Sequence, residues 1–217
     1  MITVLGRRNS ANVQKVMWTL GELDLPYRRE DIGGSFGYPE DYPNPNQVVP
    51  SMHDGDVTVW ESNACVRYLA QRYGSGSLYP NDPQALATAE SWTEWQRSDF
   101  SMAFFPMFMM AVRGAPGGPE KIADKAAATG RALTQLDQAL TSQTYIGGDA
   151  LSYADIVLGT LMYRYMTLPI ERPSLPALEA WYHRLVSRPA YQKHVMIEYG
   201  SNPEEWLAHE QANAGIQ

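Results

Sequence analysis

The chain has 217 residues, of which 44% are hydrophobic and 19% are charged, so it can bury one large core or two smaller ones. Its formal net charge is −7, from 24 acidic and 17 basic residues, which argues against a nucleic-acid partner. The single cysteine, Cys65, excludes an intrachain disulfide and a thiolate metal cluster. One cysteine also fits a reducing compartment.

Hydropathy gives no sign of a membrane partner. The chain opens on a short apolar run that leads directly into Gly6-Arg7-Arg8, which is not the pattern of a secretory leader. The densest apolar run, residues 102–112, is much shorter than the ~20 residues that a membrane-spanning helix needs. We therefore expect a cytoplasmic protein.

The first 74 residues predict a small α/β unit. Short β-prone runs are typical of strands, and apolar side chains at helical spacing indicate helices. The expected elements are a strand at 2–5, a helix at 13–23, a strand at 27–30, a loop at 33–47, strands at 49–53 and 57–60, and a helix that starts near residue 62. Asn9 or Ser10 is the predicted N-cap of the first helix.

The two strands at 49–53 and 57–60 predict a hairpin. Asp54-Gly55 joins them, and this dipeptide favours a turn in which both central residues have a positive φ. Pro50 has no N–H to donate to a neighbouring strand, so it is expected to begin its strand.

The rest of the chain predicts helices only. A linker rich in Gly, Ser and Pro is expected at 75–83, followed by one long helix from Gln84 to about Val112 that is bent at Pro106. Further helices are expected at 122–140, 153–167, 178–186 and 190–196. The helix at 153–167 is apolar nearly all round, which predicts a central, buried position.

Two polar patterns are interpreted as structural. Ser152-x-x-Asp155 has the form of a capping box, in which two side chains satisfy the free N–H groups at a helix start. The histidines lack metal-ligand spacing and form no cluster with carboxylates, so neither a metal site nor a catalytic histidine is predicted. They are His53, His183, His194 and His209.

Four segments together resemble the glutathione S-transferase family, over most of the chain. They are "NPNQVVPSMHDGDVTVWESNACVRYLAQRYG", "RRNSANVQKVMWTLGELDLPYRREDI", "YIGGDALSYADIVLG" and "LPALEAWYHRLVSRPAY". The resemblance implies a thioredoxin-like domain at 1–74 with a mixed four-stranded sheet, and an all-α bundle at 84–217. It also implies a homodimer that uses glutathione as co-substrate, with no tightly bound cofactor.

Glu61-Ser62 is the predicted anchor for the γ-glutamyl end of glutathione. A helix N-terminus has unpaired N–H groups and partial positive charge, which suit a carboxylate. Ser62 can donate to that carboxylate and Glu61 can accept from the ammonium group. Outside the family context the same two residues would be interpreted as a helix cap.

The resemblance assigns further glutathione contacts to residues 47–50. In the family, the residue before a cis-proline pairs its backbone with the cysteinyl part of the ligand, which here is Val49 before Pro50. The sequence alone leaves both cis and trans open. Val48 stands where relatives often carry a polar residue for the glycyl carboxylate, so Gln47 is the expected substitute.

Ser10 and Asn12 are the predicted catalytic residues, with Ser10 favoured as the donor to the glutathione thiolate. Lowering a thiol pKa from ~8.5 by ~2 units requires ~2.7 kcal/mol. One hydrogen bond to a charged partner supplies ~1.5–3 kcal/mol, and a helix N-terminus adds ~0.3–1 kcal/mol. The alternative for both residues is capping. Lys15, one turn further on, could add positive potential or only solvate the surface, and the second role is expected.

The second substrate is expected to be a small hydrophobic electrophile. Met102, Phe105 and Met109 belong to a run rich in Met and Phe that could line its pocket, although core packing is the alternative. Cys65 is interpreted as a packed apolar residue. Two other functions stay open: a glutathione-dependent reductase of disulfides or peroxides, and a non-catalytic binding protein of the same fold.

Overall fold

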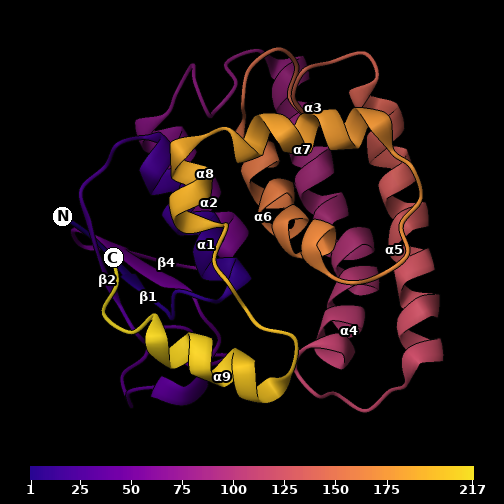
Figure 1. The fold of residues 1–217 in the computed structure, drawn as a ribbon. Helices are drawn as coiled ribbons and strands as arrows, with labels where there is room; N and C mark the ends of the chain where they lie inside the picture. Colours follow the sequence, from indigo (N-terminus) through magenta and orange to yellow (C-terminus); the bar gives the residue numbers. More distant parts are fainter.

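The computed structural model describes residues 1–217, in which a small sheet at one side of the molecule adjoins a larger group of helices (Figure 1). The N-terminal elements are β1 (Ile2–Leu5), α1 (Ala11–Glu22), β2 (Tyr27–Glu30), a 3₁₀ turn (Gly34–Phe36), β3 (Ser51–Asp54), β4 (Val57–Trp60) and α2 (Ser62–Tyr73). The helical elements are α3 (Pro83–Trp95), a π-helical turn (Gln96–Phe100), α4 (Ser101–Ala111), α5 (Pro119–Leu140), α6 (Tyr153–Thr167), α7 (Pro176–Val186), α8 (Pro189–His194) and α9 (Pro203–Ala212).

The sheet has the strand order β2-β1-β3-β4. β1 runs parallel to β2, whereas β3 is antiparallel to both β1 and β4. The predicted mixed four-stranded sheet is therefore confirmed.

The hairpin between β3 and β4 differs from the prediction in its turn. The two turn residues are Gly55 and Asp56, and only Gly55 has a positive φ, of 61°. One glycine with positive φ at the first turn position is typical of a type II′ turn. β3 begins at Ser51, because Pro50 has no N–H to offer the sheet. The Val49–Pro50 peptide bond is cis.

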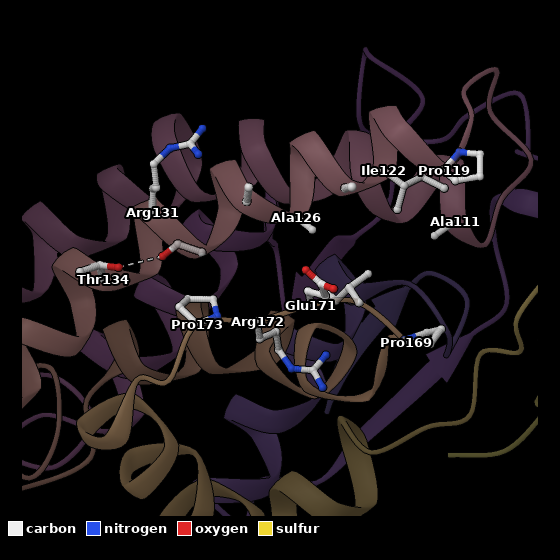
Figure 2. Close-up of a pocket in the computed structure, with 14 residues that line it drawn as sticks. Ala111, Pro119, Ile122, Ala126, Arg131, Thr134, Pro169, Glu171, Arg172 and Pro173 are labelled. Atoms are coloured by element: carbon white, nitrogen blue, oxygen red, sulfur yellow. Dashed lines mark hydrogen bonds between the residues drawn. The ribbon is translucent and has the colours of Figure 1, made fainter.

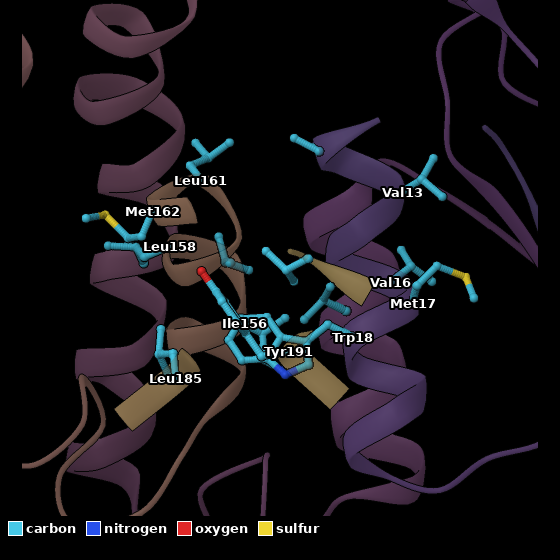
Figure 3. Close-up of a cluster of buried hydrophobic side chains, with 14 of the residues drawn as sticks. Val13, Val16, Met17, Trp18, Ile156, Leu158, Leu161, Met162, Leu185 and Tyr191 are labelled. Atoms are coloured by element: carbon cyan, nitrogen blue, oxygen red, sulfur yellow. The ribbon is translucent and has the colours of Figure 1, made fainter. Parts of the chain in front are cut away.

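α1 and α6 form the contact between the sheet-containing part and the helical part. Figure 3 shows their buried side chains facing one another, with Trp18 of α1 against Tyr191 of α8. The two rings meet edge to face at 4.7 Å. Gly159 of α6 allows this approach, since an added Cβ would lie 2.5 Å from Leu185 and 3.1 Å from Trp18. The predicted central position of α6 is confirmed.

The predicted capping box at the start of α6 is also confirmed. The side chain of Ser152 and that of Asp155 each bond the other residue's backbone. The Asp155 carboxylate also accepts from the N–H of Ile146 at 2.8 Å and from Trp181 Nε1 at 2.9 Å. One fully buried carboxylate thus ties the start of α6 to the preceding loop and to α7.

The prediction of a single long helix from Gln84 to Val112, bent at Pro106, was wrong in its detail. The irregularity lies at the π-helical turn Gln96–Phe100, whereas Pro106 lies inside α4. A π-helical turn widens the helix by one residue, and such turns are frequent at functional sites. Here the turn carries Gln96, which faces α1 and α2.

The C-terminal helix α9 was not predicted. It lies below the sheet (Figure 1), and its Trp206 packs against Phe108 of α4. It begins with Asn202, whose side chain accepts from the N–H of Glu205, and Pro203 occupies its first turn. This Asn-Pro-Glu-Glu pattern is a helix start signal, but the short segment has no clear apolar stripe to support it.

Candidate functional site

A cavity of about 640 Å³ opens at the N-terminus of α2. We call it the α2 cavity. Its wall comes from α1, from the end of β4, from the first turns of α2 and from the helical segment on both sides of the π-helical turn. The lining residues are Asn12, Lys15, Trp60, Glu61, Ser62, Asn63, Ala64, Arg67, Glu94, Gln96, Arg97, Ser101 and Phe105.

Ser62 links α2 to α1 at the floor of this cavity. Its hydroxyl donates to Asn12 Oδ1 at 3.2 Å and accepts from Lys15 Nζ at 3.5 Å. Lys15 Nζ also donates to Asn63 Oδ1 at 2.9 Å and to Gln96 Oε1 at 3.4 Å. Three elements, α1, α2 and the π-helical turn, thus supply polar groups to one small region of the wall.

The expectation that Lys15 only solvates the surface was wrong. Lys15 is 3% exposed, because α1 packs against α2 and the π-helical turn covers the remaining side. Burial lowers the pKa of the Lys15 ammonium to about 7, and the nearby Glu61 carboxylate opposes that shift. Lys15 Nζ forms no ion pair with a carboxylate. An anionic ligand in the cavity would therefore find the Lys15 ammonium group available as its counter-charge.

The capping interpretation of Glu61-Ser62 is not observed. Glu61 occupies the N-cap position of α2, but its side chain makes no capping hydrogen bond. Its φ of 68° is unusual for a residue with a side chain and costs ~1–3 kcal/mol. Ser62 is the first helical residue and lines the cavity, and the N–H groups in the first turn of a helix have no acceptor within it.

A second, smaller cavity of about 160 Å³ lies next to Ser10 and shares Asn12 and Phe105 with the first. We call it the Ser10 cavity. Its lining residues are Arg7, Ser10, Ala11, Asn12, Phe105, Phe108, Met109, Arg113, Arg164 and Trp206. Ser10 is 9% exposed and stands at the N-cap position of α1, yet its side chain makes no capping hydrogen bond. Its hydroxyl is therefore free for a ligand.

The structure brings together some of the other predicted residues but not all. Phe105 and Met109 line the Ser10 cavity, whereas Met102 is 69% exposed and lines neither cavity. Gln47 is exposed and also lines neither. Val49 is buried and lines neither cavity, and no loop hydrogen bond involves its backbone.

Cys65 is a packed residue, as the sequence predicted. Its side chain is fully buried, and its thiol contacts the carbonyl oxygen of Val59 at 3.5 Å. Burial raises the pKa of the thiol to about 12, so it is protonated at neutral pH.

Cavity size does not identify this site. A cavity of about 830 Å³ lies elsewhere, between α5 and the segment Pro169–Pro173 (Figure 2). Alanines and prolines make up much of its wall, and none of the predicted site residues lines it.

Two other kinds of site were searched for in the fold. No group of three or more His, Cys, Asp or Glu side chains could hold a metal ion. None of the helices combines the length and the apolar character that a bilayer crossing requires.

Several site residues were missed by sequence reasoning. Lys15 was considered but was assigned to the surface, although it lies three residues after Asn12 on the same helix face. Four other residues carried no such signal, because they reach the two cavities only through the packing of the π-helical turn, the end of α4, α6 and α9. They are Gln96, Arg113, Arg164 and Trp206.

Comparison with known proteins agrees with this geometry. A family model for the glutathione S-transferase N-terminal domain matches residues 5–78, and one for the C-terminal domain matches residues 100–189. Glutathione S-transferase GstB of Escherichia coli strain K12 is 37% identical over 205 residues, which are 91% of this chain and 99% of the relative. The chain belongs to the glutathione S-transferase family. The expected fold class and family are thus confirmed.

Solved structures of the family give the same result. A theta-class glutathione S-transferase from Xanthomonas axonopodis pv. citri, solved with glutathione bound, has a TM-score of 0.86 and 42% identity. That match covers 91% of this chain and 98% of the other. The apo form of the same enzyme has a TM-score of 0.80 and 40% identity. Glutathione transferase activity, with glutathione as co-substrate, is accordingly the function that this family membership supports.

Proposed function

We propose that this chain binds reduced glutathione in the α2 cavity, stabilises its thiolate at Ser10, and transfers it to a small electrophile in the Ser10 cavity. The observation that carries this proposal is the set of contacts around Ser62. Its hydroxyl, on α2, forms hydrogen bonds with Asn12 and Lys15, both on α1. The same residues lie at a helix N-terminus, which attracts anions.

The γ-glutamyl group is assigned to the inner part of the α2 cavity. Its carboxylate would accept from the Ser62 hydroxyl and from the first N–H groups of α2, with Lys15 beside it. Its ammonium group would be held by the Glu61 carboxylate. Val49 and Pro50 would pair with the cysteinyl backbone, and Gln47 would reach the glycyl carboxylate.

The thiolate is assigned to the shared border of the two cavities. Ser10 is the proposed donor because its hydroxyl has no partner in the first turn of α1. Asn12 is the alternative donor, although its Oδ1 already accepts from Ser62. Family members that form a mixed disulfide with glutathione usually carry a cysteine at this position, where this chain has Ser10. We therefore favour conjugation of glutathione over thiol exchange through a protein cysteine.

Three further statements stay predictions from the sequence and from the resemblance. The domain limits are 1–74 and 84–217 with a linker at 75–83, the protein is a homodimer, and its location is cytoplasmic. Light scattering on the purified chain tests the dimer, and limited proteolysis tests the linker. The fully buried Cys65 is compatible with a reducing compartment.

The proposed function is tested with a substrate panel in which glutathione is combined with an aryl chloride, a hydroperoxide or a small disulfide. We expect the aryl chloride to be conjugated faster than in the absence of enzyme. Millimolar glutathione should also raise the melting temperature, because it binds the folded chain. No thermal shift would favour the non-catalytic alternative, and activity on only the peroxide or disulfide would favour the reductase alternative.

A further inference from the structure

The Ser10 cavity carries an excess of positive charge. Arg7, Arg113 and Arg164 line it, and no carboxylate does. The one ion pair that these three arginines form joins Arg7 Nε to Glu210 Oε2 at 2.7 Å. One carboxylate therefore offsets one of three guanidinium groups, and two positive charges remain uncompensated at the cavity wall.

Arg164 is the deepest of these cations. It is 4% exposed, and its Nη2 donates to the carbonyl oxygen of Asn9 at 2.5 Å. Its guanidinium lies 4.9 Å from the centre of the Phe108 ring and 5.4 Å from that of Trp206. Burial, with the neighbouring arginines contributing, lowers its pKa to about 9. A buried charge without a counter-charge is costly, and an anion in the cavity would offset that cost.

Arg113 is the cation best placed to bind a ligand. Its guanidinium stacks on the Trp206 ring at 4.2 Å and makes no side-chain hydrogen bond within the protein. An arginine held by stacking keeps its planar N–H donors available for a carboxylate. Phe108 and Met109 provide apolar surface in the same cavity.

From this arrangement we propose that the second substrate is a small electrophile that carries a carboxylate, which Arg113 and Arg164 bind while an apolar portion packs on Phe108 and Met109. The proposal rests on the proposed transferase function and narrows its substrate class. The volume of about 160 Å³ is below the ~300–1,000 Å³ of typical ligand pockets, which favours a substrate of about one ring. An uncharged hydrophobic electrophile would leave both guanidinium groups unpaired.

A matched pair of aryl chlorides tests the charge alone: 4-chloro-3-nitrobenzoate and 4-chloro-3-nitrobenzamide. In each, the glutathione sulfur, already deprotonated to solvent, forms a C–S bond at the chlorine-bearing carbon. The C–Cl bond breaks and chloride leaves with the bonding electrons, so no oxidant or reductant is needed. Each kcat/KM is divided by the uncatalysed rate constant, because the two rings differ in intrinsic reactivity.

We expect this normalised kcat/KM to be about tenfold or more higher for the benzoate, as a charge-assisted hydrogen bond predicts. Arg113→Met keeps apolar contact with Trp206 but removes the charge, so it should lower the benzoate value about tenfold and the benzamide value less than about twofold. Arg113→Lys should restore part of the loss. Arg131→Met, on the exposed face of α5, is the matched control and should change neither value.

If Arg113→Met lowered the normalised kcat/KM equally for both aryl chlorides, the proposal would be overturned. An effect limited to a higher KM for glutathione would also overturn it. A second readout does not depend on turnover: calorimetric binding of unreactive 3-nitrobenzoate to the protein saturated with S-methylglutathione. Binding that Arg113→Met weakens, without turnover of either aryl chloride, would refute the transferase function and keep the anion site. Absence of 3-nitrobenzoate binding would refute the anion site and leave the transferase function standing.

Discussion

The α2 cavity and the Ser10 cavity share a wall, but they are built from the chain in different ways. The α2 cavity is centred on consecutive residues, Glu61 and Ser62, at the start of one helix. The Ser10 cavity combines side chains from the β1–α1 segment, α4, α6 and α9, which are far apart in the sequence. The comparison teaches that a site made of neighbouring residues can be identified from sequence, whereas a site made by packing cannot.

The two cavities also differ in charge. Lys15, Arg67 and Arg97 in the α2 cavity are accompanied by Glu61 and Glu94. The Ser10 cavity has three arginines and no carboxylate in its lining. A mixed set suits a zwitterionic amino-acid group, and a cationic set suits an anion. The predictions below test whether the two cavities are separate in function as well as in structure.

Trp206→Ala should have the largest effect. Trp206 is 4% exposed and packs on Phe108, so its truncation should lower the free energy of unfolding by about 3–5 kcal/mol. It should also reduce turnover of the second substrate while the Kd of S-methylglutathione changes less than about twofold. Urea unfolding and calorimetry measure the two quantities. Leu207→Ala, at a residue that is 44% exposed on the same helix, is the control. Equal weakening of glutathione binding would contradict two separate cavities.

Ser62→Ala should weaken glutathione binding without affecting the second substrate. Loss of a hydroxyl that donates to a carboxylate costs about 1.5–3 kcal/mol, so the Kd of S-methylglutathione should rise about tenfold or more. Ser91→Ala is the matched control, because Ser91 is exposed and bonds only within α3. An unchanged Kd in Ser62→Ala would remove Ser62 from the proposed binding site.

Ser10→Ala should alter the pH dependence of conjugation more than the KM for glutathione. If Ser10 donates to the thiolate, its removal should raise the kinetic pKa of the bound thiol by about 1–2 units. The rising limb of the kcat/KM profile would then move to higher pH. Asn12→Ala is the companion variant. A shift in Asn12→Ala together with an unshifted Ser10→Ala profile would transfer the role to Asn12.

Lys15 should make glutathione binding depend on pH by up to about tenfold, the smallest of these effects. Its pKa is lowered to about 7, so the cation present at pH 6 is mostly lost by pH 8. Because the cation attracts the carboxylate, S-methylglutathione should bind more tightly at pH 6 and take up a proton above pH 7. S-Methylglutathione has no thiol proton to confuse the measurement. Lys15→Met should abolish this dependence, and a pH-independent Kd in the wild type would contradict the prediction.

The same pKa shift has a consequence for folding. Between pH 7 and the usual lysine pKa of ~10.4, the unfolded chain binds the proton and the folded chain does not. Lys15 therefore contributes a gain in stability as the pH rises through this window. In the absence of ligand, Lys15→Met should flatten that part of the stability profile.

Much of the fold could be predicted because its signals are local. The apolar stripe of α5, the apolar character of α6 and the Ser152–Asp155 capping box each depend on residues within a few turns. The hairpin turn was predicted one residue too early. Asp54 pairs with Ile2 of β1 and with Val57 of β4, so it belongs to β3 and not to the turn. The π-helical turn at Gln96 and the docking of α9 on the β1–α1 region depend on contacts that no local pattern records.

By itself, the sequence determined most of the helices and strands and the Glu61-Ser62 pair at the start of α2, because periodicity, turn residues and helix ends are properties of neighbouring residues. The family came from the resemblance of four longer segments. The tertiary structure alone decided that Lys15 is buried beside Ser62 and that three arginines converge on one cavity. The physical reason is that burial and electrostatic environment are set by which distant elements pack together. A lysine or arginine has the same local sequence signal whether it lies in water or against a protein wall.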